Sequence, residues 1–122
     1  MTTPVIETTP VVNLTLKKWE DYSATCTVTD FVTNEVIDIS GWTFKADIKS
    51  RPKDTSKLAS FTFSFLTDGK DGVYIRSISK EIIQTLGIHE GVWDQFYIEG
   101  GENSKMMKGS IAIENSITDL AP

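Results

Sequence analysis

Apolar and polar residues alternate along most of this chain. In the clearest run, DISGWTFKADI at residues 38–48, the apolar Trp42, Phe44, Ala46 and Ile48 are separated by polar side chains. Successive side chains of a strand point to opposite faces of a sheet, so this period of two predicts half-buried strands. The same alternation recurs at Phe61/Phe63/Phe65, Val73/Ile75, Phe96/Ile98 and Ile111/Ile113.

These runs and the turn residues between them predict about eight short strands. Turn signals about every 8–12 residues favour a two-sheet antiparallel sandwich over a small barrel. The first two segments, joined at Glu20-Asp21, are typical of a hairpin. Phe44, Phe61, Phe63, Phe65 and Phe96 are expected in the core. The predicted strands cover residues 12–19, 22–29, 36–39, 42–48, 58–66, 73–76, 91–99 and 106–113.

One segment departs from the strand period. Ile82, Ile83 and Leu86 are spaced as on one face of a helix, and Ser79 is a suitable N-cap. The sequence therefore predicts one short helix near residues 79–86, with its apolar stripe closing an open end of the sandwich.

The chain of 122 residues is long enough for one domain with a single core. Residues 1–10 are rich in Thr and Pro and are predicted to form an extended N-terminal arm, which would order by adding a strand to a neighbour's sheet edge. We expect a single β-sandwich domain over residues 11–118 and a C-terminal tail at residues 119–122.

Charge and cysteine content narrow the class of partner. The formal net charge of −5 disfavours non-specific binding to nucleic acid or to an anionic membrane. Cys26 is the single cysteine, so an intrachain disulfide is excluded. The first ten residues lack the pattern of a secretory signal, and we expect a protein made in a reducing cytoplasm with no membrane or nucleic-acid partner.

Candidate catalytic and metal-binding residues are few. His89 is the single histidine, Cys26 lies on the apolar side of its strand, and the DGKDG run at residues 68–72 lacks the ligand spacing of a calcium loop. Asp94 has the parity of apolar residues in its strand and is expected to bond neighbouring backbone amides. We therefore predict no enzymatic activity, no catalytic residue, no cofactor and no metal.

The aromatic residues leave two interpretations open. Trp93 and Tyr97 share the strand face opposite Phe96 and Ile98. Together with Trp19 they could present a platform for a sugar or an anchor for a protein interface. Alternatively, their strand is covered on both faces and the rings pack internally.

The order of these signals resembles the small immunoglobulin-like β-sandwich domains of tailed-bacteriophage virion proteins. The resemblance covers residues 12–118. DISGW at residues 38–42 is similar to an aspartate–aliphatic–Ser/Thr–Gly turn that precedes a Trp- or aliphatic-rich strand in that group. GVWD at residues 91–94 resembles a Gly–aromatic–x–Asp step, with Trp93 shifted by one position. The closing strand from Gly109 ends in Thr118, as in the group.

This resemblance implies a non-enzymatic virion structural protein. It suggests a tail, baseplate or neck adaptor or a capsid decoration component, with other virion proteins or a homo-oligomer as partners and the virion as its location. The alternative from the aromatic residues is a carbohydrate-binding module that uses Trp93, Tyr97 and Trp19.

Overall fold

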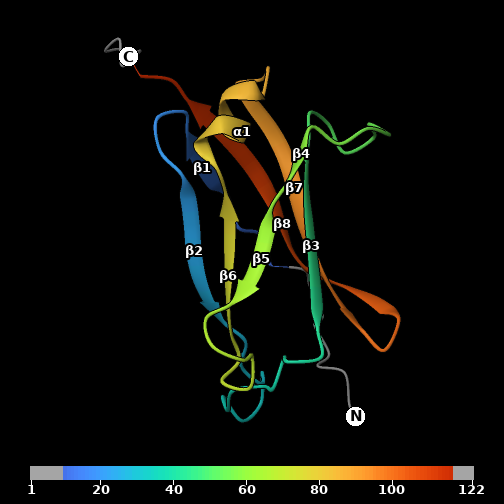
Figure 1. Ribbon diagram of the computed structural model, residues 1–122. Helices are drawn as coiled ribbons and strands as arrows, with labels where there is room; N and C mark the ends of the chain where they lie inside the picture. Colours follow the sequence, from blue (N-terminus) through green and yellow to red (C-terminus); the bar gives the residue numbers. More distant parts are fainter. Residues whose placement is uncertain (1–9, 117–122) are drawn as a thin grey trace.

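The chain folds as an all-β sandwich of two sheets with one short helix (Figure 1). The computed structural model describes residues 10–116. The predicted tail at residues 119–122, and the predicted arm apart from Pro10, lie outside the described residues.

The larger sheet, sheet A, has five strands in the order β1-β8-β7-β3-β4. Its neighbours are antiparallel except for β1 and β8, which run parallel. The two longest strands, β7 and β8, form a hairpin that extends beyond the body of the sandwich (Figure 1). The strands are β1 (Leu14–Lys17), β3 (Thr43–Lys49), β4 (Ala59–Ser60), β7 (Glu90–Glu99) and β8 (Glu102–Glu114).

The smaller sheet, sheet B, is antiparallel throughout, with the order β2-β6-β5. It packs on one face of sheet A. Its strands are β2 (Tyr22–Thr27), β5 (Thr62–Phe65) and β6 (Val73–Ile78).

The run predicted as one strand at residues 58–66 serves both sheets. Ala59 and Ser60 pair with β3 in sheet A, whereas Thr62–Phe65 pair with β6 in sheet B. At the crossing between them, the Phe61 N–H donates to the Ala46 carbonyl at 2.9 Å and the ring is buried. The alternation continues through the crossing, so the local pattern contains no sign of it.

Two sequence predictions about pairing are wrong. Segments 12–19 and 22–29 do not form a hairpin, because β1 pairs with β8 in sheet A and β2 pairs with β6 in sheet B. Residues 36–39 are not a strand; Val36 makes an isolated bridge to Thr29. The first error follows from reading adjacency in sequence as adjacency in the sheet, and the second from a local pattern too short to form a ladder.

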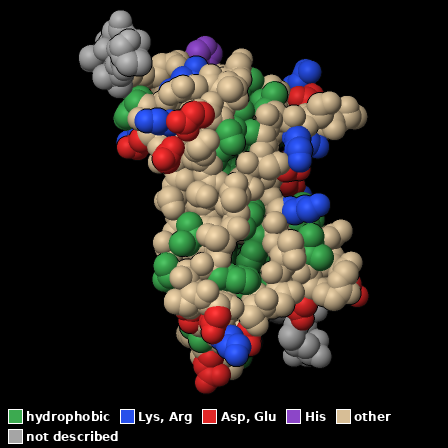
Figure 2. Space-filling model, in the orientation of Figure 1, with side chains coloured by type: hydrophobic (Ala, Val, Ile, Leu, Met, Phe, Trp, Pro, Cys, Tyr) green, Lys and Arg blue, Asp and Glu red, His purple; other side chains and the backbone are tan. Residues whose placement is uncertain are grey.

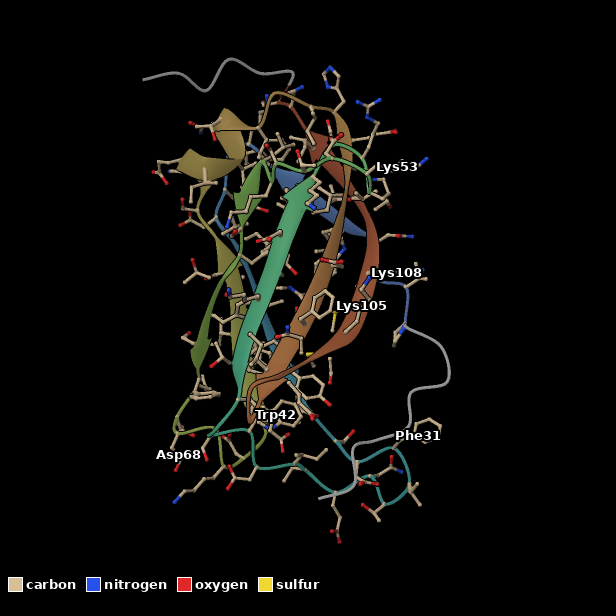
Figure 3. All side chains as sticks on the ribbon, turned by 90° about the vertical axis from the view of Figure 1, so that its right-hand side faces the viewer. Phe31, Trp42, Lys53, Asp68, Lys105 and Lys108 are labelled. Carbon is tan, nitrogen blue, oxygen red and sulfur yellow. The ribbon has the colours of Figure 1, made fainter. Side chains whose placement is uncertain are left out.

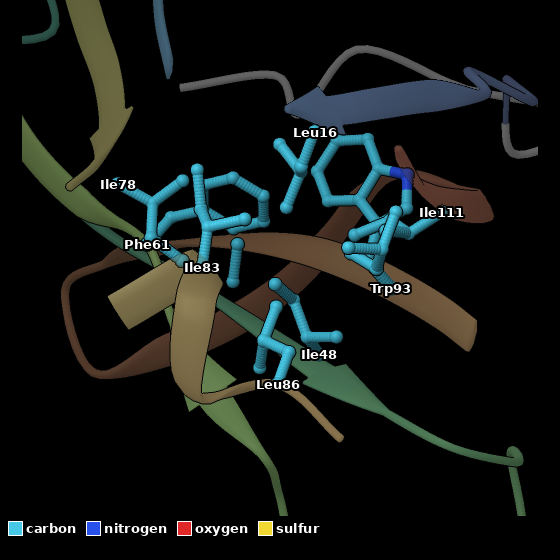
Figure 4. Packing of buried hydrophobic residues seen from close by; sticks show 10 residues of the cluster. Leu16, Ile48, Phe61, Ile78, Ile83, Leu86, Trp93 and Ile111 are labelled. Atoms are coloured by element: carbon cyan, nitrogen blue, oxygen red, sulfur yellow. The ribbon is translucent and has the colours of Figure 1, made fainter. Parts of the chain in front are cut away.

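The predicted helix is confirmed as α1 (Lys80–Thr85). The Ser79 hydroxyl caps it by accepting the Ile82 N–H at 3.4 Å. Ile83 is fully buried and Leu86 nearly so, and Figure 4 shows both side chains within the core. The apolar stripe therefore closes one end of the sandwich, as the sequence predicted.

The core contains two clusters. One, shown in Figure 4, surrounds Phe61 and Trp93, whose rings meet edge to face with centres 5.6 Å apart. The other contains Trp42, which stacks on Tyr97 with ring centres 4.1 Å apart. Trp42 is therefore part of the core.

A buried arginine lies inside the sandwich. Arg76 is only 4% exposed, and its guanidinium donates to the Gln95 Oε1 at 2.9 Å and to the Tyr22 hydroxyl at 2.8 Å. The guanidinium carbon lies 4.8 Å from the centre of the Trp93 ring. The Nε atom has no hydrogen-bond partner within the described structure. Neutral dipoles and an aromatic face thus solvate this charge.

This arginine is part of a third wrong prediction, which concerns the side chains of β6 and β7 that point into the core. Tyr74, Arg76 and Ile78 point inward on β6 in place of Val73 and Ile75, and Trp93, Gln95 and Tyr97 point inward on β7 in place of Phe96 and Ile98. Gln95 can be buried because it bonds Arg76 and its amide nitrogen donates to the Tyr74 hydroxyl at 2.9 Å.

The other candidate residues lie in a bend, a strand and a turn. His89 is exposed, and Cys26 is half-buried with a free thiol. The 68–72 segment is a turn in which the Asp68 carboxylate accepts the Lys70 N–H at 2.9 Å, and Gly69 and Gly72 have positive φ. In the part of the chain that the structure describes, no helix is long and apolar enough to cross a membrane and no cluster of metal-binding side chains occurs.

Candidate functional site

The outer face of sheet A carries a groove of about 840 Å³. Strands β3, β7 and β8 form it, and sheet B covers the opposite face of the same strands. Figure 3 looks onto this face and shows Lys105 and Lys108 in front of β8. We call it the lysine groove. Its floor is Val92, Phe96 and Ile98, and its basic residues are Lys45, Lys49, Lys105 and Lys108.

Strand register places these side chains in rows across the sheet. Phe96 is opposite Lys45 on β3 and Lys105 on β8, so a ring is flanked by lysines on both sides. The Lys105 ammonium lies 5.4 Å from the centre of that ring. Cross-strand neighbours on one face lie close enough for their side chains to interact. The groove therefore alternates apolar surface with positive charge.

A β-bulge brings both lysines of β8 to this face. Lys105 and Lys108 are three residues apart and would point to opposite faces of a regular strand. The register shifts by one residue beside Gln95 and Phe96, so β8 presents one extra residue there. The adjacent Met106 and Met107 both face the core, where their sulfur atoms lie 3.4 Å from Gln95 and 3.5 Å from Arg76.

The apolar floor lies on a face of sheet A that no second sheet covers among residues 10–116. Val92, Phe96 and Ile98 are half-buried on the outer side of β7, with Asp94 between Val92 and Phe96. Apolar surface gathered in a hollow and rimmed by charge is typical of a binding face, whereas single exposed apolar residues are common everywhere. The reversed facing of β7 thus has a functional consequence, because it moves Phe96 from the core to the groove.

The groove has a positive balance in an acidic protein. Four lysines and two aspartates line it, a formal sum of +2, whereas the whole chain carries −5. Both aspartates have partners: Asp94 lies 3.3 Å from Lys105, and Asp47 lies 3.9 Å from Lys57. Of the four groove lysines, Lys45, Lys49 and Lys108 have no acidic partner within 4.0 Å among residues 10–116.

The two aspartates face each other across β3 and β7. Like charges directly opposite on a sheet face are destabilising, and their neighbours reduce the cost here. The Ser60 hydroxyl donates to the Asp47 carboxylate at 2.6 Å, and Lys105 pairs with Asp94. The prediction that Asp94 turns to backbone amides is wrong, because its strand has the opposite facing and the side chain is at the surface.

The aromatic residues proposed as contacts do not present exposed rings, although Trp93 is among the residues that line the groove. Trp93 is 3% exposed and Tyr97 is 5% exposed, so the surface position expected for them is wrong. Trp93 packs against Phe61, and its indole N–H donates to the Val12 carbonyl at 2.8 Å. In this fold neither ring is available as a platform for a sugar. The second interpretation, internal packing of the strand, describes both residues.

Trp19 is half-buried and lies in the turn after β1, apart from the groove. The Lys17 ammonium lies 5.8 Å from the centre of its ring. The structure therefore does not bring the three predicted aromatic residues together into one site.

Sequence reasoning missed the groove for an identifiable reason. Lys45 and Lys49 are visible as the polar positions of the alternating run at residues 42–48 and beyond it, but polar positions of a strand usually face only water. Their significance depends on Phe96 lying opposite them, which required the facing of β7. The bulge in β8 also has no local sequence signal.

Comparison with known proteins supports the fold. No protein-family model and no curated protein matches the sequence. Among solved structures, the N-terminal domain of phage TP901-1 ORF48 is similar with a TM-score of 0.50 and 13% identity, over 84% of this chain and 85% of that one. At this identity the likeness concerns the fold: a phage protein contains a β domain of similar architecture.

A second similar structure is the NK cell receptor NKp44. It aligns with a TM-score of 0.42 and 10% identity, over 89% of this chain and 99% of that one. A likeness at this level carries no argument.

Proposed function

We propose that this protein is a non-enzymatic structural component of a tailed-bacteriophage virion and that it acts through protein contacts at the lysine groove. The observation that carries the protein-contact part is the half-exposed set of Val92, Phe96 and Ile98, which no second sheet covers among residues 10–116 and which lysines flank. The similar fold of a phage TP901-1 domain, together with the sequence resemblance, supports the phage part. A tail or neck adaptor or a capsid decoration protein, with an immunoglobulin-like sandwich, is the finer form of this proposal.

The lysine groove suits a protein better than a nucleic acid. The chain carries a net charge of −5, and two aspartates stand in the middle of the groove between the lysines. A phosphate backbone tracking the lysines would meet these carboxylates, whereas a protein segment can place apolar side chains and single carboxylates separately.

The proposal is tested by mass spectrometry of purified virions of the phage that encodes the chain. We expect the chain to remain with the particles through density-gradient purification at a reproducible number of copies. Its absence from purified particles that contain all the other structural proteins would contradict the proposal.

A further inference from the structure

A second surface of this molecule has apolar residues at full exposure. Phe31 is 83% exposed and Val32 is 85% exposed, side by side at the tip of the loop formed by residues 30–36. Figure 3 shows Phe31 at the lower end of the molecule, well below Lys105 and Lys108. An exposed aromatic residue beside an exposed valine is unusual for a surface loop of an isolated domain.

The 30–36 loop holds this pair in a defined position. The Asp30 carboxylate accepts the backbone N–H groups of Val32 and Thr33 at 2.8 and 2.9 Å. The Asp30 N–H donates to the Glu35 carbonyl at 2.8 Å, and Asn34 has a φ of 60°. A loop ordered by its own hydrogen bonds loses little conformational entropy when its tip is buried by a partner.

The surroundings of this tip are acidic. The loop of residues 30–38 is followed by Ile39, whose N–H donates to the Gly69 carbonyl of the 67–72 loop at 2.9 Å. The two loops therefore lie side by side. They contain five carboxylates and one lysine, a formal sum of −4, and Figure 2 shows acidic side chains gathered at the lower end. We call this the acidic end. Its charged residues are Asp30, Glu35, Asp38, Asp68, Lys70 and Asp71.

The acidic end and the lysine groove are complementary in both charge and polarity. One is a protruding apolar tip with negative surroundings, and the other is a hollow with an apolar floor and three lysines that have no acidic partner within 4.0 Å among the described residues. Figure 2 shows basic side chains along the right-hand edge, above the acidic lower end.

We propose that the groove of one molecule binds the 30–36 loop of a second copy, with Phe31 and Val32 on the floor formed by Val92, Phe96 and Ile98. This inference rests on the proposed function of the groove as a protein-binding face. The contact joins different surfaces of the two copies, so a bound pair keeps one free tip, on the first copy, and one free groove, on the second. Such head-to-tail contacts produce rings if the rotation closes and filaments if it does not.

The contact is small, because a single loop enters it, and interfaces below about 1,200 Å² are typical of weak association. It is therefore measured with the full chain at concentrations up to about 1 mM by sedimentation equilibrium. We expect the average mass to exceed that of two molecules at the highest concentration in about 50 mM salt, and to fall towards that of one molecule in about 500 mM salt.

Two variants separate the two halves of the contact. Phe31→Asp removes the apolar tip at an exposed position, and Lys45→Glu with Lys108→Glu reverses two groove charges that have no acidic partner within 4.0 Å. Each variant alone is expected to weaken self-association at least tenfold. Matched controls are Ile82→Asp on the exposed side of α1, and Lys18→Glu with Lys80→Glu outside the groove. Circular dichroism and thermal unfolding verify that all variants fold.

Mixing the two variants gives the decisive outcome. The tip variant retains a groove and the groove variant retains a tip, so the mixture should form one-to-one dimers that grow no further. A wild-type chain that stays monomeric at about 1 mM would overturn the inference, and so would assemblies that neither variant affects or a mixture that stays monomeric.

These failures are distinct from failure of the proposed function. If the wild-type chain is monomeric but the groove variant is lost from virions, the groove binds another virion protein and only the self-association is overturned. If the chain self-associates through the groove but is absent from virions, the contact stands and the virion role does not.

Discussion

At the scale of single residues, Arg76 links the two sheets, because it lies on β6 and bonds Gln95 on β7. Its charge is buried with no carboxylate within 4.0 Å among residues 10–116, and Gln95 supplies an acceptor at 2.9 Å. Burying a polar pair is tolerable when both members are hydrogen-bonded, and costly when one is removed. The facing of β6 and β7 therefore depends on a contact between residues 19 positions apart.

Removing Gln95 should expose this dependence. Gln95→Leu leaves the guanidinium without its carboxamide partner, and we expect the free energy of unfolding to fall by about 1–3 kcal/mol. In Arg76→Met combined with Gln95→Leu the loss should be smaller than the sum of the two single losses, because neither the guanidinium nor the carboxamide is left buried without the other. Urea denaturation measures the free energy of unfolding of the two single variants and of the double variant, with the exposed Gln84→Leu as control. Additive losses would show that the two side chains act independently.

Tyr74 makes the stability of the folded state depend on pH. Burial, and next the nearby Cys26 thiol, raise the pKa of its phenol to about 12, above the usual value of about 10. The folded state therefore favours the neutral phenol. Its contribution to stability is complete below pH 10 and is lost as the pH rises towards 12, by at most about 3 kcal/mol.

Denaturation at a series of alkaline pH values tests this expectation. Stability of the wild-type chain should fall more steeply between about pH 10 and pH 12 than that of Tyr74→Phe, which has no phenol to ionise. Equal slopes for the two proteins would contradict the assignment.

Among the elements, the loops at the acidic end are joined at Gly72. Gly72 has a φ of 74°, and a Cβ there would lie 2.9 Å from the carbonyl oxygens of Val28 and Ile37. The Gly72 carbonyl also accepts the Val28 N–H at 2.8 Å. This residue thus joins the 68–72 turn to the segments that carry the 30–36 loop.

Gly72→Ala should therefore destabilise the protein, by about 1–3 kcal/mol, through both the positive φ and the close approach of the backbone. The matched control is Gly41→Ala, where a Cβ has nothing within 4 Å and φ lies outside the left-handed region. Thermal unfolding compares the two, and equal stability would show that the turn adjusts without cost.

Much of this element content could be predicted from the sequence. The period of two located most strands, and helical spacing with Ser79 located α1, because these signals are local. Which strands pair, and which face of β7 is buried, could not be predicted. These depend on contacts far apart in the chain: β1 with β8, Arg76 with Gln95, and the bulge that turns both Lys105 and Lys108 outward.

At the scale of the whole molecule, the distribution of charge bears more directly on partner binding than the net charge does. A net charge of −5 predicted an acidic surface, but the structure gathers the basic residues of β3 and β8 around one hollow and leaves the carboxylates of two loops at one end. Partner binding through such separated patches is expected to weaken with salt, because screening reduces the attraction between solvent-exposed charges.

The central claim is that the lysine groove is the protein-binding face of a virion component. Competition during infection tests it most directly: the wild-type chain and the Lys45→Glu/Lys108→Glu variant are co-expressed at equal levels, and their ratio in purified virions is measured by mass spectrometry. We predict at least a tenfold excess of the wild-type chain, and near-equal incorporation of the Lys18→Glu/Lys80→Glu control. Equal incorporation of the groove variant and the wild-type chain would contradict the claim.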